Sequence, residues 1–90
     1  MRLMHVVDSL EYGGLERVVT DLAIEQKRQG HEVIVFSLQS TEGLAPELKR
    51  SGVEVAIGHK RGAADLRMLR HMCRLTRDRR IEMVHSHNVV

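Results

Sequence analysis

Four short apolar runs alternate with three longer segments along this chain, and that alternation limits the possible folds more than any other feature. The runs are rich in β-branched residues and end at turn residues, so each predicts a strand; they cover residues 2–7, 32–38, 53–57 and 81–85. Between them, the spacing predicts helices over 15–29 and 63–76, with a loop and a short helix over 41–51. Strands that alternate with helices lie parallel in one sheet. The sequence therefore predicts an α/β fold, a Rossmann-like doubly wound parallel sheet with strand order 3-2-1-4.

In this order the first and fourth strands are neighbours at the point where the crossovers leave in opposite directions. A crevice opens there at the carboxyl ends of the strands, and we expect the functional site in it. The sequence stops at Val90, just past the fourth strand, which would leave that strand as an unpaired edge. We therefore expect residues 1–90 to be the N-terminal part of a Rossmann-like domain truncated after its fourth strand.

The composition argues against several other classes of protein. A net charge of +2 with only 2% aromatic residues leaves little surface for stacking on bases, so we expect no nucleic acid binding. Cys73 is the one cysteine, and it cannot form an internal disulfide, which fits a cytoplasmic protein. The apolar start over residues 3–7 is too short for a signal-peptide core or a membrane span.

A pair of glycines closes the turn after the first strand. Gly13 and Gly14 have no side chains and lead directly into the predicted helix, whose first N–H groups carry a partial positive charge. A diphosphate would fit there, although a tight turn without any ligand explains the same two glycines equally well. The turn has neither the Walker A pattern nor the three-glycine dinucleotide pattern. Ser37, at the end of the second strand where an acidic residue would bind a ribose, disfavours a nicotinamide enzyme.

A second group of polar residues closes the fourth strand: His85, His87 and Asn88. Residues two apart on a strand face the same way, so the two histidines converge if the strand continues through both. They could bind a metal ion, with Asp8 of the adjacent strand as a third ligand. They could instead form hydrogen bonds with sugar hydroxyls and phosphate, or each could be a structural histidine. The neighbouring Asn88 favours a binding role.

The helix predicted over residues 63–76 carries two stripes. The apolar stripe, expected to face the sheet, consists of Leu66, Leu69, Met72, Cys73 and Leu75. The basic stripe consists of Arg67, Arg70, Arg74 and Arg77. Such a stripe is usually a solvated face, and its alternative role is peripheral contact with an anionic membrane surface.

Four stretches together resemble glycosyltransferase family 4: MHVV at 4–7, GGLER at 13–17, GHEV at 30–33 and VHSH at 84–87. The resemblance covers nearly the whole chain. The order and spacing of these stretches, more than any single one, are typical of retaining transferases built from two Rossmann-like domains, the GT-B type.

Membership of this family implies a nucleotide-sugar donor bound mainly by a second domain and a hydroxyl-bearing acceptor bound mainly by this one. It implies no cofactor and no catalytic metal. By resemblance, Gly13 and Gly14 would contact the donor diphosphate, and His85, His87 and Asn88 would line the acceptor side of the cleft. The catalytic residues would lie beyond Val90, so we expect this fragment to be inactive alone.

The implied reaction is attack by an acceptor hydroxyl on the anomeric carbon while the nucleoside diphosphate leaves from the same face. It would serve the synthesis of a cell-surface polysaccharide or glycolipid, and the basic stripe would suit a lipid-linked acceptor at the inner face of the membrane. Two alternatives to the transferase are a metal-dependent hydrolase that uses His85 and His87, and a non-catalytic, nucleotide-binding Rossmann module.

Overall fold

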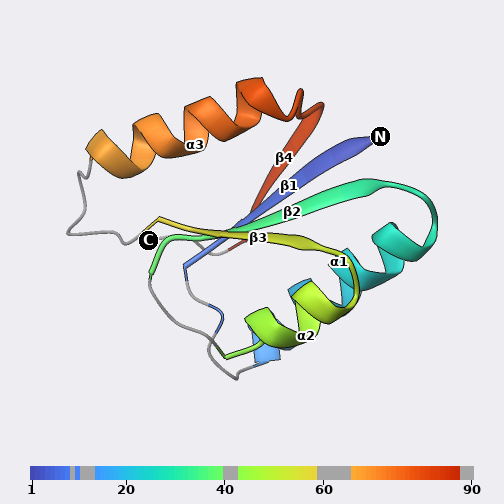
Figure 1. Ribbon diagram of the computed structural model, residues 1–90. Coiled ribbons are helices and arrows are strands. Elements are labelled where there is room, and N and C mark those ends of the chain that lie inside the picture. The colour runs from blue at the N-terminus through green and yellow to red at the C-terminus, as the bar shows by residue number, and fades with distance from the viewer. Residues whose placement is uncertain (9, 11–13, 40–42, 59–65, 88–90) are drawn as a thin grey trace.

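The described strands form one parallel sheet of order β3-β2-β1-β4 (Figure 1). The structure is a computed structural model that describes residues 1–8, 10, 14–39, 43–58 and 66–87. Its strands are β1 (Arg2–Val7), β2 (Glu32–Ser37), β3 (Glu54–Ile57) and β4 (Met83–His87). All three neighbouring pairs are parallel, which confirms the predicted fold class and strand order.

Helices cover both faces of this sheet (Figure 1). The helices α1 (Gly14–Arg28) and α2 (Ala45–Arg50) lie on one face, and α3 (Leu66–Asp78) lies on the other. The chain therefore winds outward from β1 through β2 to β3 on one side and returns to β4 across the opposite side. This change of side is the doubly wound arrangement, and it makes β1 and β4 neighbours.

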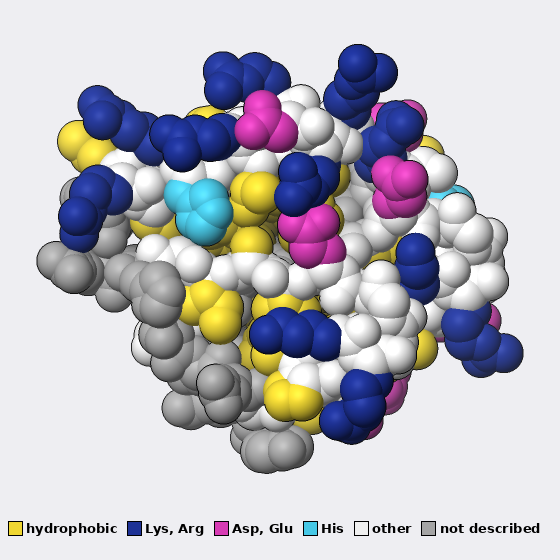
Figure 2. Space-filling model, in the orientation of Figure 1, with side chains coloured by type: hydrophobic (Ala, Val, Ile, Leu, Met, Phe, Trp, Pro, Cys, Tyr) yellow, Lys and Arg dark blue, Asp and Glu magenta, His cyan; other side chains and the backbone are white. Residues whose placement is uncertain are grey.

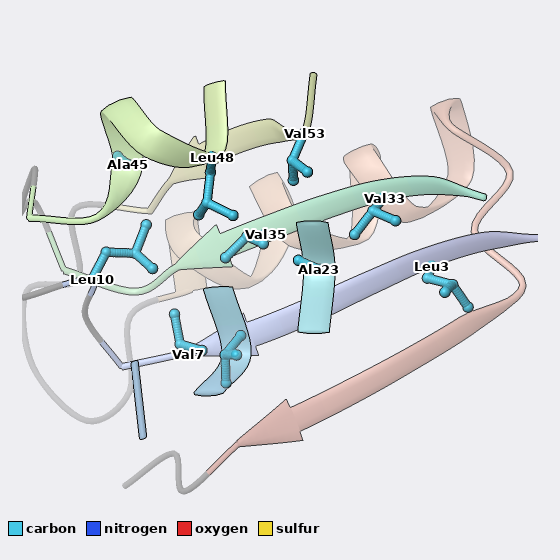
Figure 3. Packing of buried hydrophobic residues seen from close by; sticks show 10 residues of the cluster. Leu3, Val7, Leu10, Ala23, Val33, Val35, Ala45, Leu48 and Val53 are labelled. Atoms are coloured by element: carbon cyan, nitrogen blue, oxygen red, sulfur yellow. The ribbon is translucent and has the colours of Figure 1, made fainter. Parts of the chain in front are cut away.

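Strands β1 and β2 send alternate side chains into two apolar cores. The core under α1 and α2 contains Leu3, Val7, Leu10, Val19, Ala23, Val33, Val35, Ala45, Leu48 and Val53 (Figure 3). The core under α3 contains Met4, Val6, Ile34, Phe36, Leu38 and Met68. Because β1 and β2 are covered on both faces, their sequences are almost continuously apolar. The edge strand β4 is covered much less, and its Met83 and Val84 are 52% and 47% exposed.

Two positions after the last residue of each described helix, the chain has left-handed backbone geometry. These residues are Gly30 (φ 98°), Gly52 (φ 85°) and Arg80 (φ 51°). In each case the N–H of the following residue donates to a helix carbonyl five positions back. The donor and acceptor pairs are His31 with Gln26, Val53 with Leu48, and Ile81 with Thr76. This closure satisfies carbonyl groups that a helix end would otherwise leave bare, and it turns the chain directly into the next strand.

The fourth strand begins and ends two residues later than predicted. Ile81 is occupied in closing α3, so regular pairing begins at Met83, opposite Leu3, and continues to His87, opposite Val7. The shift matters for the site because it keeps both His85 and His87 within the strand.

The predicted buried face of α3 is partly wrong. Met68 is buried, and Met72 and Leu75 pack beside it, whereas Leu66 and Leu69 are 67% and 46% exposed and Cys73 is exposed too. Two apolar lines run along this helix at helical spacing, and only the one that includes Met68 contacts the sheet. On α1 the same distinction holds: Val19 and Ala23 are buried, while Leu15, Val18 and Leu22 are exposed.

Candidate functional site

The carboxyl ends of β1 and β4 lie side by side at one edge of the sheet. The two strands are parallel, and Val7 at the end of β1 pairs with His87 at the end of β4. The helix α1 begins at Gly14, after the turn that leaves β1. The strand that carries the histidine pair therefore ends beside the carboxyl end of β1, from which the chain leads into α1. Gly13 and Asn88 lie outside the described residues.

Gly14 stands at the start of α1 with free space beside it. A Cβ atom built on Gly14 would have no described atom within 4 Å, so packing does not require a glycine there. Nor does the backbone require one, because Gly14 is absent from the described residues that have positive φ. The helix N-terminus beside it offers N–H groups and a partial positive charge. This open helix end could accept an anionic group.

Residues near the ends of β1 and β2 are held by hydrogen bonds within the protein. The Asp8 carboxylate accepts a hydrogen bond from the Gln39 side chain (3.0 Å), and the Gln39 N–H donates to the Asp8 carbonyl (3.0 Å). Ser37 is buried, and its hydroxyl donates to the Gln39 carbonyl (2.9 Å). These bonds fix the turn after β2 against the end of β1. The Ser37 hydroxyl therefore has a structural role, since it holds the backbone of the turn after β2.

Arg17, in the first turns of α1, connects this helix with α2. Its guanidinium donates to the Asp21 carboxylate one turn later (2.6 Å) and also to the Glu47 carboxylate of α2. The hydrogen bonds to Glu47 and then Asp21 raise the pKa of Arg17. Arg17 therefore connects α1 with α2, and its guanidinium is bound to Asp21 and Glu47.

Three histidine rings gather on the face of the sheet that α1 covers. His85 lies opposite His5 in the pairing of β4 with β1, and His87 follows two positions later on the same face. The ring centroids of His85 and His87 are 3.9 Å apart, and those of His5 and His87 are 5.1 Å apart. The sequence placed His85 and His87 together but did not single out His5. The strand order 3-2-1-4 puts the first strand beside the fourth, but only the register shows that His5 lies opposite His85.

A short chain of hydrogen bonds runs from α1 through His5 to His87. The His5 Nε2 atom lies 2.7 Å from the Gln26 Oε1 atom, and the His5 Nδ1 atom lies 2.9 Å from the His87 Nε2 atom. An amide oxygen can only accept, so Nε2 of His5 carries the hydrogen and Nδ1 of the neutral ring presents a lone pair. The Gln26 side chain therefore determines which nitrogen of His5 faces the cluster.

Burial lowers the pKa of two of these rings. It lowers the pKa of His5, against the opposing effect of the Gln26 hydrogen bond and with a further lowering by His85. It also lowers the pKa of His87, to which His85 and His5 add. A lowered pKa means that the uncharged, lone-pair form of the ring is favoured.

Asp8, considered above as a possible third metal ligand, does not belong to the cluster that contains His85 and His87. Within the described residues, the side chains close enough to share an ion are His5, His85 and His87, whose ligand atoms all lie within 4.8 Å of one another. Asp8 follows the end of β1, and its carboxylate is bonded to the turn after β2. The third nitrogen comes from the middle of β1, because parallel pairing puts His5 directly beside His85.

The basic stripe lies on the outer side of α3, away from the candidate site. Arg67, Arg70, Arg74 and Arg77 are all exposed. Figure 2 shows dark blue side chains gathered along the upper part of the molecule, which Figure 1 identifies as the α3 side. Arg77 lies 3.6 Å from the Asp78 carboxylate. The exposed Leu66, Leu69 and Cys73 run along the same helix, so its outer surface is both basic and partly apolar.

Comparison with known proteins gives one match. The family model described as Glycosyltransferase Family 4 matches residues 12–90, which include α1, all the later elements and the histidine pair. No curated protein and no solved structure matches the chain significantly. Among the described residues, no helix has the length and apolar character needed to cross a membrane.

Proposed function

The chain belongs to glycosyltransferase family 4, and from that premise we propose that it is the N-terminal, acceptor-side part of an enzyme that transfers a sugar from a nucleotide sugar to a hydroxyl acceptor with retention. One observation carries the proposal: parallel pairing of β1 with β4 puts His87 beside the carboxyl end of β1, the end from which the chain leads into α1. A transferase needs a place for the leaving diphosphate next to a place for the acceptor. This edge offers groups suited to both.

The donor diphosphate is assigned to Gly13 and Gly14. The space beside Gly14 supports this, because a phosphate can approach the backbone only where no side chain intervenes. In the reaction, negative charge grows on the leaving diphosphate, and a fixed helix terminus stabilises that charge without having to reorganise. The proposed transfer therefore uses no cofactor and no catalytic metal.

The acceptor is assigned to His85, His87 and Asn88. His85 is exposed on β4 and His87 is half-buried beside it, so the pair passes from solvent into the face that α1 covers. Neutral imidazoles both donate and accept hydrogen bonds, which suits recognition of sugar hydroxyls. In this proposal the pair orients the acceptor, and the residues that act on the reacting atoms lie beyond Val90, so the chain alone is inactive.

The rest of the enzyme is proposed to contain a second Rossmann-like domain that binds most of the nucleotide sugar. The surface of α3 supports a further assignment, to a cytoplasmic enzyme that makes a cell-surface polysaccharide or glycolipid and touches the inner face of the membrane. Exposed arginines beside exposed apolar side chains are the chemistry by which a helix binds anionic lipid at a surface.

The test is an assay of the intact enzyme with a panel of nucleotide sugars and hydroxyl acceptors. We expect acceptor-dependent release of nucleoside diphosphate and a product whose anomeric configuration, read by NMR, equals that of the donor. The isolated chain should release none. An inverted product, or no release with any nucleotide sugar, would contradict the proposal.

A further inference from the structure

His5 extends the histidine pair of β4 to a cluster of three rings, although His5 itself has no part in the proposed sugar transfer. Each ring presents one nitrogen, and the three ligand atoms lie within 4.8 Å of one another. We propose that one nitrogen each of His5, His85 and His87 binds a single transition-metal ion of the zinc class, which takes no part in the transfer chemistry and leaves the second nitrogen of His85 and of His87 to the acceptor. The ion would connect β1 with the edge strand β4.

The orientation of His5 supports this assignment. Gln26 accepts the hydrogen of Nε2 (2.7 Å), which leaves the lone pair of Nδ1 directed at His87. Metal-binding histidines commonly have their second nitrogen held by an oxygen acceptor in this way, because the contact fixes the ring and the tautomer. Gln26 would therefore hold the ring of His5 in place without touching the ion.

The type of ligand determines the type of ion. Three imidazoles without a carboxylate suit Zn²⁺, Ni²⁺, Co²⁺ or Cu²⁺, whereas Mg²⁺ and Ca²⁺ require oxygen ligands. His5 is 2% exposed and His85 is exposed, so the site is closed toward the sheet and open toward solvent. Three protein nitrogens and one open position for water make a usual four-coordinate zinc arrangement.

Without an ion, the hydrogen bond between His5 and His87 (2.9 Å) satisfies the Nδ1 atom of His5. When an ion binds, it replaces that hydrogen bond: the proton on Nε2 of His87 moves to Nδ1 of the same ring, and the freed lone pair turns to the metal. The two rings stay neutral, and no proton need leave the protein from this pair. Binding therefore competes only with one hydrogen bond, so the cluster is already close to the bound arrangement.

The experiment is calorimetric titration of the purified protein, carrying no polyhistidine tag, with Zn²⁺ and in parallel with Mg²⁺. We expect binding of one Zn²⁺ per chain and no Mg²⁺ binding. His85→Ala removes an exposed ligand and spares both cores, and it should weaken Zn²⁺ binding by at least about 10-fold. Gln26→Leu should weaken Zn²⁺ binding by about 10- to 100-fold, the usual effect of losing the hydrogen-bond acceptor that holds a metal-binding histidine. His31→Ala is the matched control, because His31 lies at the opposite edge beside the N-terminal amine (3.2 Å); it should bind as the unaltered protein does.

Thermal unfolding provides a second measurement. An ion that binds only the folded chain raises the unfolding temperature, so Zn²⁺ should raise it for the unaltered protein and for His31→Ala but not for His85→Ala. Equal Zn²⁺ affinity in His85→Ala and the unaltered protein, or no Zn²⁺ binding at all, would overturn the proposal. Neither result depends on sugar transfer, so the metal site and the transferase assignment fail or stand separately.

Discussion

The Nδ1 atom of His5 lies 2.9 Å from the Nε2 atom of His87, although 82 positions separate the two residues in the sequence. The contact exists because β1 and β4 pair in parallel, with His87 beyond the residue that faces His5. The contact lies beside the last turn of α1, where the Gln26 Oε1 atom is 2.7 Å from the Nε2 atom of His5. A side-chain hydrogen bond thus connects the first and last described strands, in addition to their backbone pairing.

The hydroxyl of Thr20 provides a test of the core under α1. This side chain is fully buried, and Oγ1 has no hydrogen-bond partner among the described residues. Valine keeps the shape of threonine and removes the buried hydroxyl, and a buried hydroxyl without a partner destabilises a fold. Thr20→Val should therefore raise the free energy of unfolding by about 1 kcal/mol. Thr76→Val is the matched control: Thr76 Oγ1 donates to the Met72 carbonyl (2.8 Å), and its loss should bring no gain. Urea denaturation measures both, and a clear loss of stability in Thr20→Val would show that the hydroxyl has a partner in solution.

The end of α3 should be improved by a glycine. Arg80 has φ 51°, in the region that costs an ordinary residue about 1–2 kcal/mol. Arg80→Gly relieves this cost but gives the unfolded chain more freedom, so the expected net gain in unfolding free energy is about 0.5 kcal/mol. The reverse change, Gly30→Ala at φ 98°, should cost about 1 kcal/mol. Thermal unfolding checks the opposite signs; if both variants shift in the same direction, the shared helix ending is not the cause.

Much of the fold could be predicted from the sequence, because it follows from connectivity. Once strands alternate with helices, crossover handedness leaves few arrangements, and the order β3-β2-β1-β4 is one of them. That His85 and His87 lie on the same face of β4 followed from the two-residue period of a strand. These inferences needed no knowledge of contacts between distant residues.

What could not be predicted depends on register and rotation. His5 sits inside an apolar strand and has the pattern of a core residue, so only the register of β1 against β4 reveals its place beside His85. On α3, both Leu69 and Met72 fit the apolar spacing of a helix. The rotation of α3 about its own axis turns Met72 toward the core, and it depends on the close packing of Met68 against Phe36 and Gly58. A Cβ on Gly58 would lie 2.8 Å from the Met68 side chain, which shows how close that approach is.

Membrane contact through α3 predicts a dependence on charge. Reversing Arg70 and Arg74 to Glu should weaken sedimentation with vesicles that contain acidic lipid by about 10-fold or more, because each basic residue near the surface contributes about 1 kcal/mol. The control reverses Lys49 and Arg50 on α2, which lies on the opposite face and gives the same change in net charge. Equal losses in the two double variants would indicate a general charge effect and no docking by α3.

The proposed leaving-group chemistry predicts that chelation does not stop transfer. In the proposed reaction the start of α1 stabilises the charge on the diphosphate, so treating the intact enzyme with EDTA should leave kcat within about 2-fold of its untreated value. The measurement is nucleoside diphosphate release before and after chelation. A loss of most activity that added Mg²⁺ or Mn²⁺ restores would assign that task to a metal.

Substitution of Gly14 in the intact enzyme tests the central claim most directly. Its surroundings are open, so Gly14→Leu should fold normally, yet the new side chain would occupy the space assigned to the diphosphate. We predict that kcat/KM for the nucleotide sugar falls by about 10-fold or more, a loss of about 1.4 kcal/mol in transition-state stabilisation, and that Gly14→Ala falls less. Arg28→Leu, at the other end of α1, should leave kcat/KM unchanged. If a correctly folded Gly14→Leu enzyme uses the donor as well as the unaltered enzyme, the start of α1 does not hold the diphosphate.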